Sequence, residues 1–108
     1  MKSERLKTLL QWLDEKPKDS FLTFALAQEY HKMEDCDEAI KTYRKLESMD
    51  PDYVGLYYHL AHCYVILENN TEALEVYNAG IEIARKLNDH HALSELQNAR
   101  TNLEMEML

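Results

Sequence analysis

The sequence of 108 residues contains only two glycines, two prolines and two cysteines. Glycine-rich phosphate-binding loops and tight β-turns need more glycine and proline than this, so the composition favours an all-α chain with tight connections. Cys36 and Cys63 are well separated and form no CxxC pair. We therefore expect two reduced thiols, as in an ordinary cytoplasmic protein.

Long apolar runs are also lacking. No stretch approaches the roughly 20 apolar residues that a membrane-spanning helix needs. The first seven residues, Met-Lys-Ser-Glu-Arg-Leu-Lys, have neither the apolar core nor the cleavage site of a secretory signal. At 108 residues the chain is long enough for one domain with a modest core and too short for two. A single soluble cytoplasmic domain, residues 1–108, is the expectation.

Basic residues are scarce. Twelve Lys and Arg stand against twenty Asp and Glu, which gives a formal net charge of −8. Residues 1–18 carry five basic and three acidic groups, while residues 19–108 carry seven and seventeen. Such an acidic surface repels phosphate backbones and anionic lipid, so we expect neither nucleic acid nor a membrane among the partners.

A period of 34 residues runs through the middle of the chain. Residues 20–53, laid without a gap over residues 54–87, are identical at eight positions. A fixed period of this length indicates a repeat architecture, in which each unit buries its apolar face against its neighbours. The eight identical pairs are Leu22/Leu56, Leu26/Leu60, Ala27/Ala61, Tyr30/Tyr64, Glu34/Glu68, Glu38/Glu72, Ala39/Ala73 and Tyr43/Tyr77.

Apolar periodicity within these units predicts about six helices. The last one has a polar outer face, as a terminal helix requires when nothing covers it. The expected N-caps of the four helices that follow the first are Asp19 or Ser20, Asp37, Asp52 and Thr71. The predicted helices span about 3–16, 20–33 and 37–49, then one after Asp52 that reaches Leu67, one from Thr71 to Leu87, and one at 89–106.

The pattern resembles the tetratricopeptide repeat, a helix–turn–helix unit of 34 residues. The positions that carry the resemblance are Leu26, Ala27, Tyr30, Ala39, Tyr43 and Pro51 in one unit, and Tyr57, Leu60, Ala61, Tyr64, Ala73, Tyr77 and Gly80 in the next. The family's usual glycine between the helices is replaced by Glu34 and Glu68. Cys63 stands where the family often has alanine, so the resemblance implies a buried residue there, whereas we expect Cys36 in the turn to be more exposed. The resemblance implies helical hairpins stacked in a right-handed superhelix. It divides the chain into a half-repeat helix at 3–16, repeats at 20–53 and 54–87, and a capping helix at 89–106.

Members of this family act mostly as binding platforms, with the first helix of each hairpin lining a concave groove. The resemblance therefore implies a protein or peptide partner, no cofactor and no catalysis. Arg100 of the last helix is a further candidate for the groove. The expected groove residues are Phe24, Gln28, His31, Lys32, Tyr58, His59, His62, Val65, Ile66 and Leu96.

Alternative functions remain open from the sequence. The chain could self-associate as a structural module or small secretion-type chaperone, through apolar residues such as Met105, Met107 and Leu108; we expect a monomer or a weak homodimer. A metal site at His59 and His62 lacks the three or four ligands that zinc needs. No catalytic motif is visible. The family's two-carboxylate clamp for acidic C-terminal tails is not expected either, because its positions hold Phe24, Gln28, His59, Asp89 and Leu93.

Overall fold

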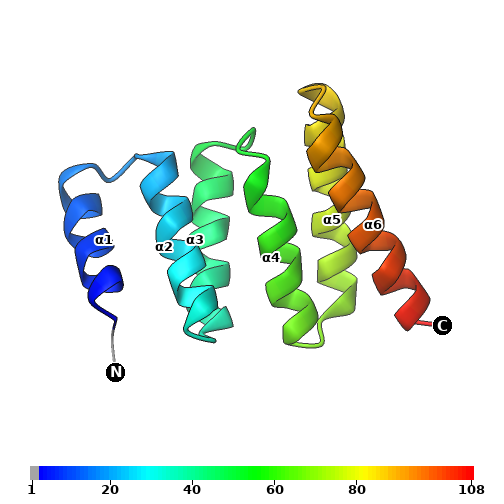
Figure 1. The fold of residues 1–108 in the computed structure, drawn as a ribbon, viewed down its shortest axis with the longest axis horizontal. Helices are drawn as coiled ribbons and strands as arrows, with labels where there is room; N and C mark the ends of the chain where they lie inside the picture. Colours follow the sequence, from blue (N-terminus) through cyan, green and yellow to red (C-terminus); the bar gives the residue numbers. More distant parts are fainter. Residues whose placement is uncertain (1–2) are drawn as a thin grey trace. The chain divides into compact units, whose positions relative to one another are not determined.

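The computed structural model of the chain describes residues 3–108, which form six α-helices and no strand (Figure 1). The all-α prediction is therefore confirmed. The chain divides into two compact units, Met1–Tyr53 and Val54–Leu108. The six helices are α1 (Glu4–Glu15), α2 (Ser20–Lys32), α3 (Cys36–Met49), α4 (Gly55–Ile66), α5 (Asn70–Lys86) and α6 (His90–Glu106).

In the first unit, α2 packs against both α1 and α3. The α1–α2 contact is a cluster of buried aliphatic side chains, which the partly buried Leu13, Leu22, Tyr30 and Met33 extend. Ala27 of α2 and Ala39 of α3 are both fully buried, as expected for small residues where two helices of a hairpin approach closely. The buried members of the α1–α2 cluster are Leu6, Leu9, Ala25 and Leu26.

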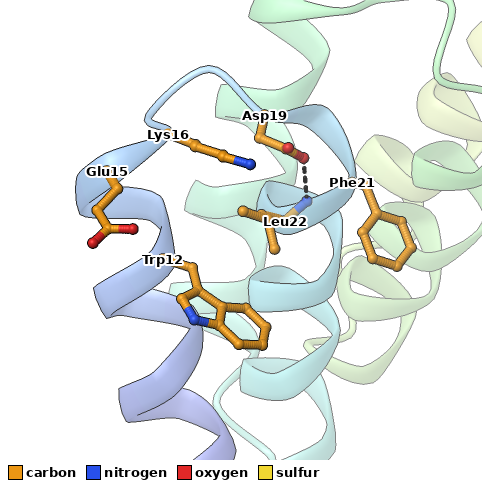
Figure 2. Close-up of a pocket in the computed structure, with 6 residues that line it drawn as sticks. All are labelled: Trp12, Glu15, Lys16, Asp19, Phe21 and Leu22. Atoms are coloured by element: carbon orange, nitrogen blue, oxygen red, sulfur yellow. Dashed lines mark hydrogen bonds between the residues drawn. The ribbon is translucent and has the colours of Figure 1, made fainter.

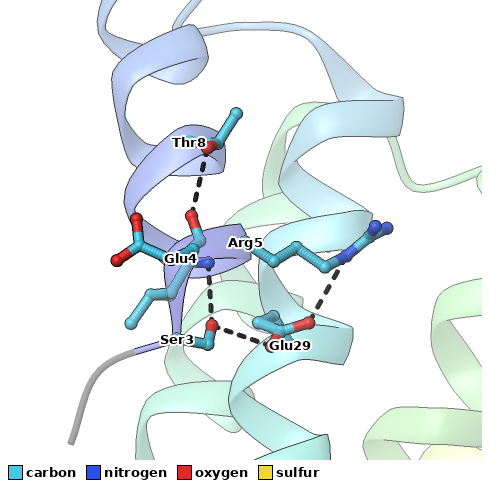
Figure 3. A network of polar contacts seen from close by, with 6 residues as sticks. Ser3, Glu4, Arg5, Thr8 and Glu29 are labelled. Carbon is cyan, nitrogen blue, oxygen red and sulfur yellow. Dashed lines mark hydrogen bonds and ion pairs between the residues drawn. The ribbon is translucent and has the colours of Figure 1, made fainter.

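A polar network also joins α1 to α2 (Figure 3). The carboxylate of Glu29 is buried in α2 and accepts a hydrogen bond of 2.9 Å from the Ser3 hydroxyl. The Nε atom of Arg5 lies 3.4 Å from the same carboxylate. Ser3 Oγ also accepts from the backbone N–H of Leu6, so one hydroxyl both caps α1 and holds it to α2. A buried charge is tolerated here because it has these partners.

In the second unit, α5 packs against both α4 and α6, and α4 also contacts α6. Ala61 and Ala73 repeat the small-residue crossing and are fully buried. Gly80 of α5 provides another close approach. A Cβ added there would lie 2.6 Å from the Cβ of Tyr57 and 3.1 Å from Cδ1 of Leu96. Only glycine allows both neighbouring helices to come this near without a shift.

Three helices end in the same way, with one residue in the left-handed region. These residues are Glu34, Glu68 and Asn88, with φ of 62°, 61° and 56°. After α2, the N–H of Glu34 donates to the carbonyl of His31 and that of Asp35 to the carbonyl of Tyr30, at 3.0 and 2.9 Å. This pair of bonds is the Schellman motif. The same two bonds recur after α4 and after α5. The predicted end of the fifth helix near Leu87 is confirmed.

Of the four predicted N-caps, one is confirmed. Asp19 caps α2 by accepting from the N–H of Leu22 at 2.9 Å (Figure 2). The predicted caps Asp37 and Thr71 are wrong, because Asp35 and Asn69 cap α3 and α5 instead. Each cap is the residue that follows the left-handed one, so a single short turn both ends one helix and begins the next.

Two further expectations need correction. Asp52 does not cap α4, which begins at Gly55 after Val54 and has no side-chain cap. The chain between α3 and α4 forms a backbone turn instead, in which the N–H of Tyr53 donates to the carbonyl of Asp50. Cys36, expected in an exposed turn, is the first residue of α3 and only 6 % exposed. Cys63 is fully buried, as predicted.

Within residues 3–108, none of the helices combines the length and the apolar character needed to cross a bilayer.

Candidate protein-interaction site

The second unit contains a pocket of about 250 Å³ between α4, α5 and α6. Three of its lining residues, Tyr58, His62 and Val65, belong to the groove that the sequence predicted. They are spaced four and three residues apart on α4, which places them on one stripe of the helix. We call this site the Tyr58 pocket; the remaining side chains that line it are Tyr77, Ala99, Asn102, Leu103 and Glu106.

The chemistry of the Tyr58 pocket is mixed. Val65 and the buried Leu103 provide aliphatic surface, while Tyr58 and Tyr77 provide aromatic surface with hydroxyl groups. Burial, and secondarily the neighbouring Tyr58, raises the pKa of Tyr77 to about 12. The Tyr77 hydroxyl therefore stays protonated at all physiological pH values and can donate a hydrogen bond. Glu106 adds a carboxylate at the edge, where its side chain is exposed.

His59 lies next to the pocket and is half-buried. Its ring packs edge-on against Tyr58, with 5.5 Å between the ring centroids. Desolvation by burial lowers the pKa of His59 below 6.5; Glu95 opposes this effect and His62 adds to it. The imidazole is therefore neutral at pH 7, and it can donate or accept a hydrogen bond without presenting a charge.

In the first unit the predicted groove residues fall into two groups. Phe24 and His31 are half-buried around Tyr43, at centroid distances of 6.2 and 6.4 Å, and Phe24 also packs against Tyr53 at 5.1 Å. Part of the Phe24 surface is therefore committed to the unit's own packing. The remainder is open to a partner.

Gln28 and Lys32 form the second group. Both are exposed and line a polar pocket of about 310 Å³, which also includes Arg5, Ala25 and Glu29. The structure thus places Gln28 and Lys32 beside the α1–α2 polar network, apart from the aromatic contacts of Phe24.

The two remaining predicted residues, Ile66 and Leu96, line neither pocket. Ile66 is at the end of α4 with its side chain 50 % exposed. The prediction that Leu96 lines the groove is wrong. Leu96 is 1 % exposed and packs at Gly80, so it belongs to the core and cannot contact a partner. The reason is that the absence of a side chain at Gly80 lets α6 settle close to α5.

Tyr77 and the last turns of α6 also line the site, which the sequence did not predict. Tyr77 is only 4 % exposed, yet it also lines the Tyr58 pocket. Ala99, Asn102 and Glu106 follow one another at spacings of three and four residues, a helical stripe that could have been recognised. Within residues 3–108 no group of three or more His, Cys, Asp or Glu side chains is arranged to hold a metal ion.

The sequence profile of the tetratricopeptide repeat matches residues 25–99. The chain belongs to the tetratricopeptide repeat family. This family is generally a non-catalytic protein-interaction fold. A comparison with curated proteins gives no significant match.

Solved structures agree with this assignment. A tetratricopeptide repeat domain protein from Salinibacter ruber is 42 % identical, with a TM-score of 0.76 over 80 % of this chain and 96 % of that one. The TPR2B domain of yeast Sti1, solved as a complex with pHsp70, is 20 % identical with a TM-score of 0.87, over 94 % and 81 %. The type III secretion translocator chaperone SycD of Yersinia enterocolitica is 17 % identical with a TM-score of 0.86, over 94 % and 71 %. At such low identity the last two show the tetratricopeptide fold alone.

Proposed function

We propose that this tetratricopeptide repeat protein is a non-catalytic interaction module that binds a segment of a partner protein on the first helices of its hairpins. The Tyr58 pocket is the centre of the proposed site. A cytoplasmic location stays a prediction of the sequence. Each unit is proposed to contribute its own contacts: Phe24, Gln28, His31 and Lys32 in the first unit, and Tyr58, His59, His62, Val65 and Ile66 in the second.

The observation that carries the proposal is the Tyr58 pocket itself. Peptide-binding sites combine an apolar pocket for one anchoring side chain with polar groups that fix the orientation of the segment. Val65 and Leu103 suit an aliphatic anchor, and the hydroxyl of Tyr77 and the amide of Asn102 suit backbone groups. Glu106 favours a basic residue beside the anchor, in keeping with the acidic character of the chain.

The structural relatives support a peptide-binding role without supplying a partner. The yeast Sti1 domain binds pHsp70 in its structure. We do not extend that ligand to this chain, because Phe24, Gln28 and His59 stand at clamp positions where a carboxylate needs lysine or asparagine. The proposed ligand is instead a segment with an aliphatic anchor and a basic neighbour.

Selection from a library of displayed random peptides tests the proposal. Peptides retained by the wild-type protein should share an aliphatic residue next to Lys or Arg, and Tyr58→Ala should weaken their binding by about 30-fold, the loss expected for an aromatic anchor. Leu87→Ala is the matched control, since Leu87 is an exposed apolar residue outside the site, at 42 %.

The affinities can be measured by fluorescence anisotropy, with far-UV circular dichroism to show that each variant keeps its helices. Equal affinity of the wild type and Tyr58→Ala would refute the proposed site. Acidic consensus peptides would refute the proposed ligand class while leaving the site intact.

A further inference from the structure

An aromatic face on α1 and the start of α2 lies outside the Tyr58 pocket and meets the pocket of Gln28 and Lys32 only at its edge, through Arg5 and Ala25. Trp12 is 51 % exposed and Phe21 is 68 % exposed, unusually high for such large apolar side chains. Two adjoining pockets, of about 350 and 250 Å³, share Trp12, Phe21 and Leu22 as lining residues (Figure 2). We call this surface the Trp12 face; it consists of Arg5, Thr8, Leu9, Trp12, Glu15, Lys16, Asp19, Phe21, Leu22 and Ala25.

The repeat register indicates that the position of Trp12 is built for burial. The residues 34 and 68 positions later are Leu46 in α3 and Gly80 in α5, and both are buried. Gly80 meets Tyr57 of α4 on one side and Leu96 of α6 on the other. Within residues 3–108, α1 packs on α2 alone. The side of α1 that corresponds to the α4 side of α5 therefore lacks a helix.

The charges of the Trp12 face are arranged so that the face complements itself. Arg5, Thr8, Trp12 and Glu15 follow one another at spacings of three and four residues, so they form one stripe along α1. The stripe begins with a cation, Arg5, which pairs with Glu29 through Nε and keeps a largely exposed side chain, and it ends with an anion, Glu15. Thr8 and Trp12 lie between them. Lys16 and Asp19, at the Glu15 end, oppose each other in sign. An antiparallel copy of the stripe would place each Arg5 opposite a Glu15.

We propose that the Trp12 face binds the same face of a second copy of this chain, with the two α1 helices antiparallel about a two-fold axis. A two-fold interface joins identical patches, so it requires a surface that is complementary to itself. The stripe meets this condition in charge, and Trp12 and Phe21 provide the apolar centre. The antiparallel helix of the second copy occupies the side of α1 that α4 occupies on α5.

Analytical ultracentrifugation of the wild-type protein from micromolar to millimolar concentration tests the proposal. The expected result is a monomer–dimer equilibrium. Trp12→Ser and Phe21→Ser should each raise the dimer dissociation constant by about 30-fold, as expected for a central aromatic residue. Leu10→Ser is the control, because Leu10 is also exposed on α1, at 39 %, but does not line the face.

The antiparallel arrangement has its own test. In the antiparallel dimer each Glu15 faces Arg5 of the other copy, so Glu15→Lys would replace both ion pairs with repulsive Lys–Arg contacts. We expect the dimer dissociation constant to rise by about 10-fold or more, and high salt to reduce this rise. Asp14→Lys makes the same change of charge one residue away from the stripe and should leave the dimer intact. Equal effects of these two variants would overturn the antiparallel pairing.

Three results would overturn the dimer through this face. They are a wild-type monomer at millimolar concentration, a dimer that both serine variants leave unchanged, and a dimer that Leu10→Ser weakens as much as Trp12→Ser does. Tyr58→Ala should not alter the dimer, so failure of this inference and failure of the proposed peptide site are separate outcomes.

Discussion

Replacing Glu34 or Glu68 with glycine should stabilise the protein. Both glutamates hold the left-handed position of a Schellman motif, at φ of 62° and 61°. A side chain at this position crowds its own backbone, and glycine avoids the contact. The surrounding hydrogen bonds involve backbone atoms only, so glycine can keep all of them.

The size of the effect is the sum of three terms, one of them unfavourable. A residue other than glycine pays about 1–2 kcal/mol for left-handed geometry. Glycine loses about 0.5–1 kcal/mol more conformational entropy on folding. Each glutamate also lies at the negative end of a helix, where removing its charge adds about 0.3 kcal/mol. The net expectation is about 1 kcal/mol for each substitution, and nearly twice that for the double variant because the sites are far apart in the sequence and share no hydrogen bond.

Urea unfolding followed by circular dichroism measures this gain, and the same change should raise Tm by roughly 4 °C. Glu34→Gln is the matched control: it removes the charge but keeps the side chain, so it should recover only the small electrostatic part. If the glutamine and glycine variants were equally stable, charge and not backbone strain would be the cause. A loss of stability in both glycine variants would refute the reasoning altogether.

Three further predictions follow from buried groups. Gly80→Ala should destabilise by about 1–3 kcal/mol in urea unfolding, because the new Cβ would lie 2.6 Å from the Cβ of Tyr57, an atom that cannot move without its backbone. Glu29→Gln should cost about 1 kcal/mol in the same assay, since a neutral amide is a weaker acceptor for Ser3 and loses the ion pair with the largely exposed Arg5. His59→Gln should flatten the loss of stability between pH 8 and pH 5.5, because the unfolded imidazole gains a proton near 6.5 while burial lowers the pKa of the folded one.

Neighbouring exposed residues provide the controls. Ala79→Ser and Gln28→Ala should each change the free energy of unfolding by less than about 0.5 kcal/mol, the usual range for surface sites. If Ala79→Ser lowered the free energy of unfolding as much as Gly80→Ala, the effect would reflect a general sensitivity of α5 to substitution and not the contact with Tyr57. For His59, the prediction is contradicted if His59→Gln loses as much stability between pH 8 and pH 5.5 as the wild type does.

The period and the small residues were enough to predict the helical hairpins. Ala27 and Ala39 recur as Ala61 and Ala73, and all four are fully buried at the crossings that the pattern implied. The N-caps were harder to predict, because glycine usually marks the left-handed residue of such a turn and here glutamate occupies it. Asp35 and Asn69 are favourable N-cap types, but without a glycine before them the sequence did not distinguish them from Asp37 and Thr71.

Only the site residues that share one helix could be predicted from the sequence. Tyr58, His62 and Val65 follow from the stripe of α4, and the Tyr58 pocket contains all three. Tyr77 and Glu106 depend on how α5 and α6 pack against α4. That packing is a tertiary property, which a helical period alone does not specify.

Gly80 explains both why Leu96 is buried and how α6 comes to line the Tyr58 pocket. The same missing side chain that buries Leu96 against α5 brings α6 close to that helix, and α6 supplies Ala99 and Leu103 to the Tyr58 pocket. A larger residue at Gly80 must push on Tyr57 or on Leu96, and Tyr57 adjoins Tyr58 in α4. The wall of the pocket that α6 provides, and with it the fit of any anchoring side chain, therefore depends on a glycine that does not line the pocket.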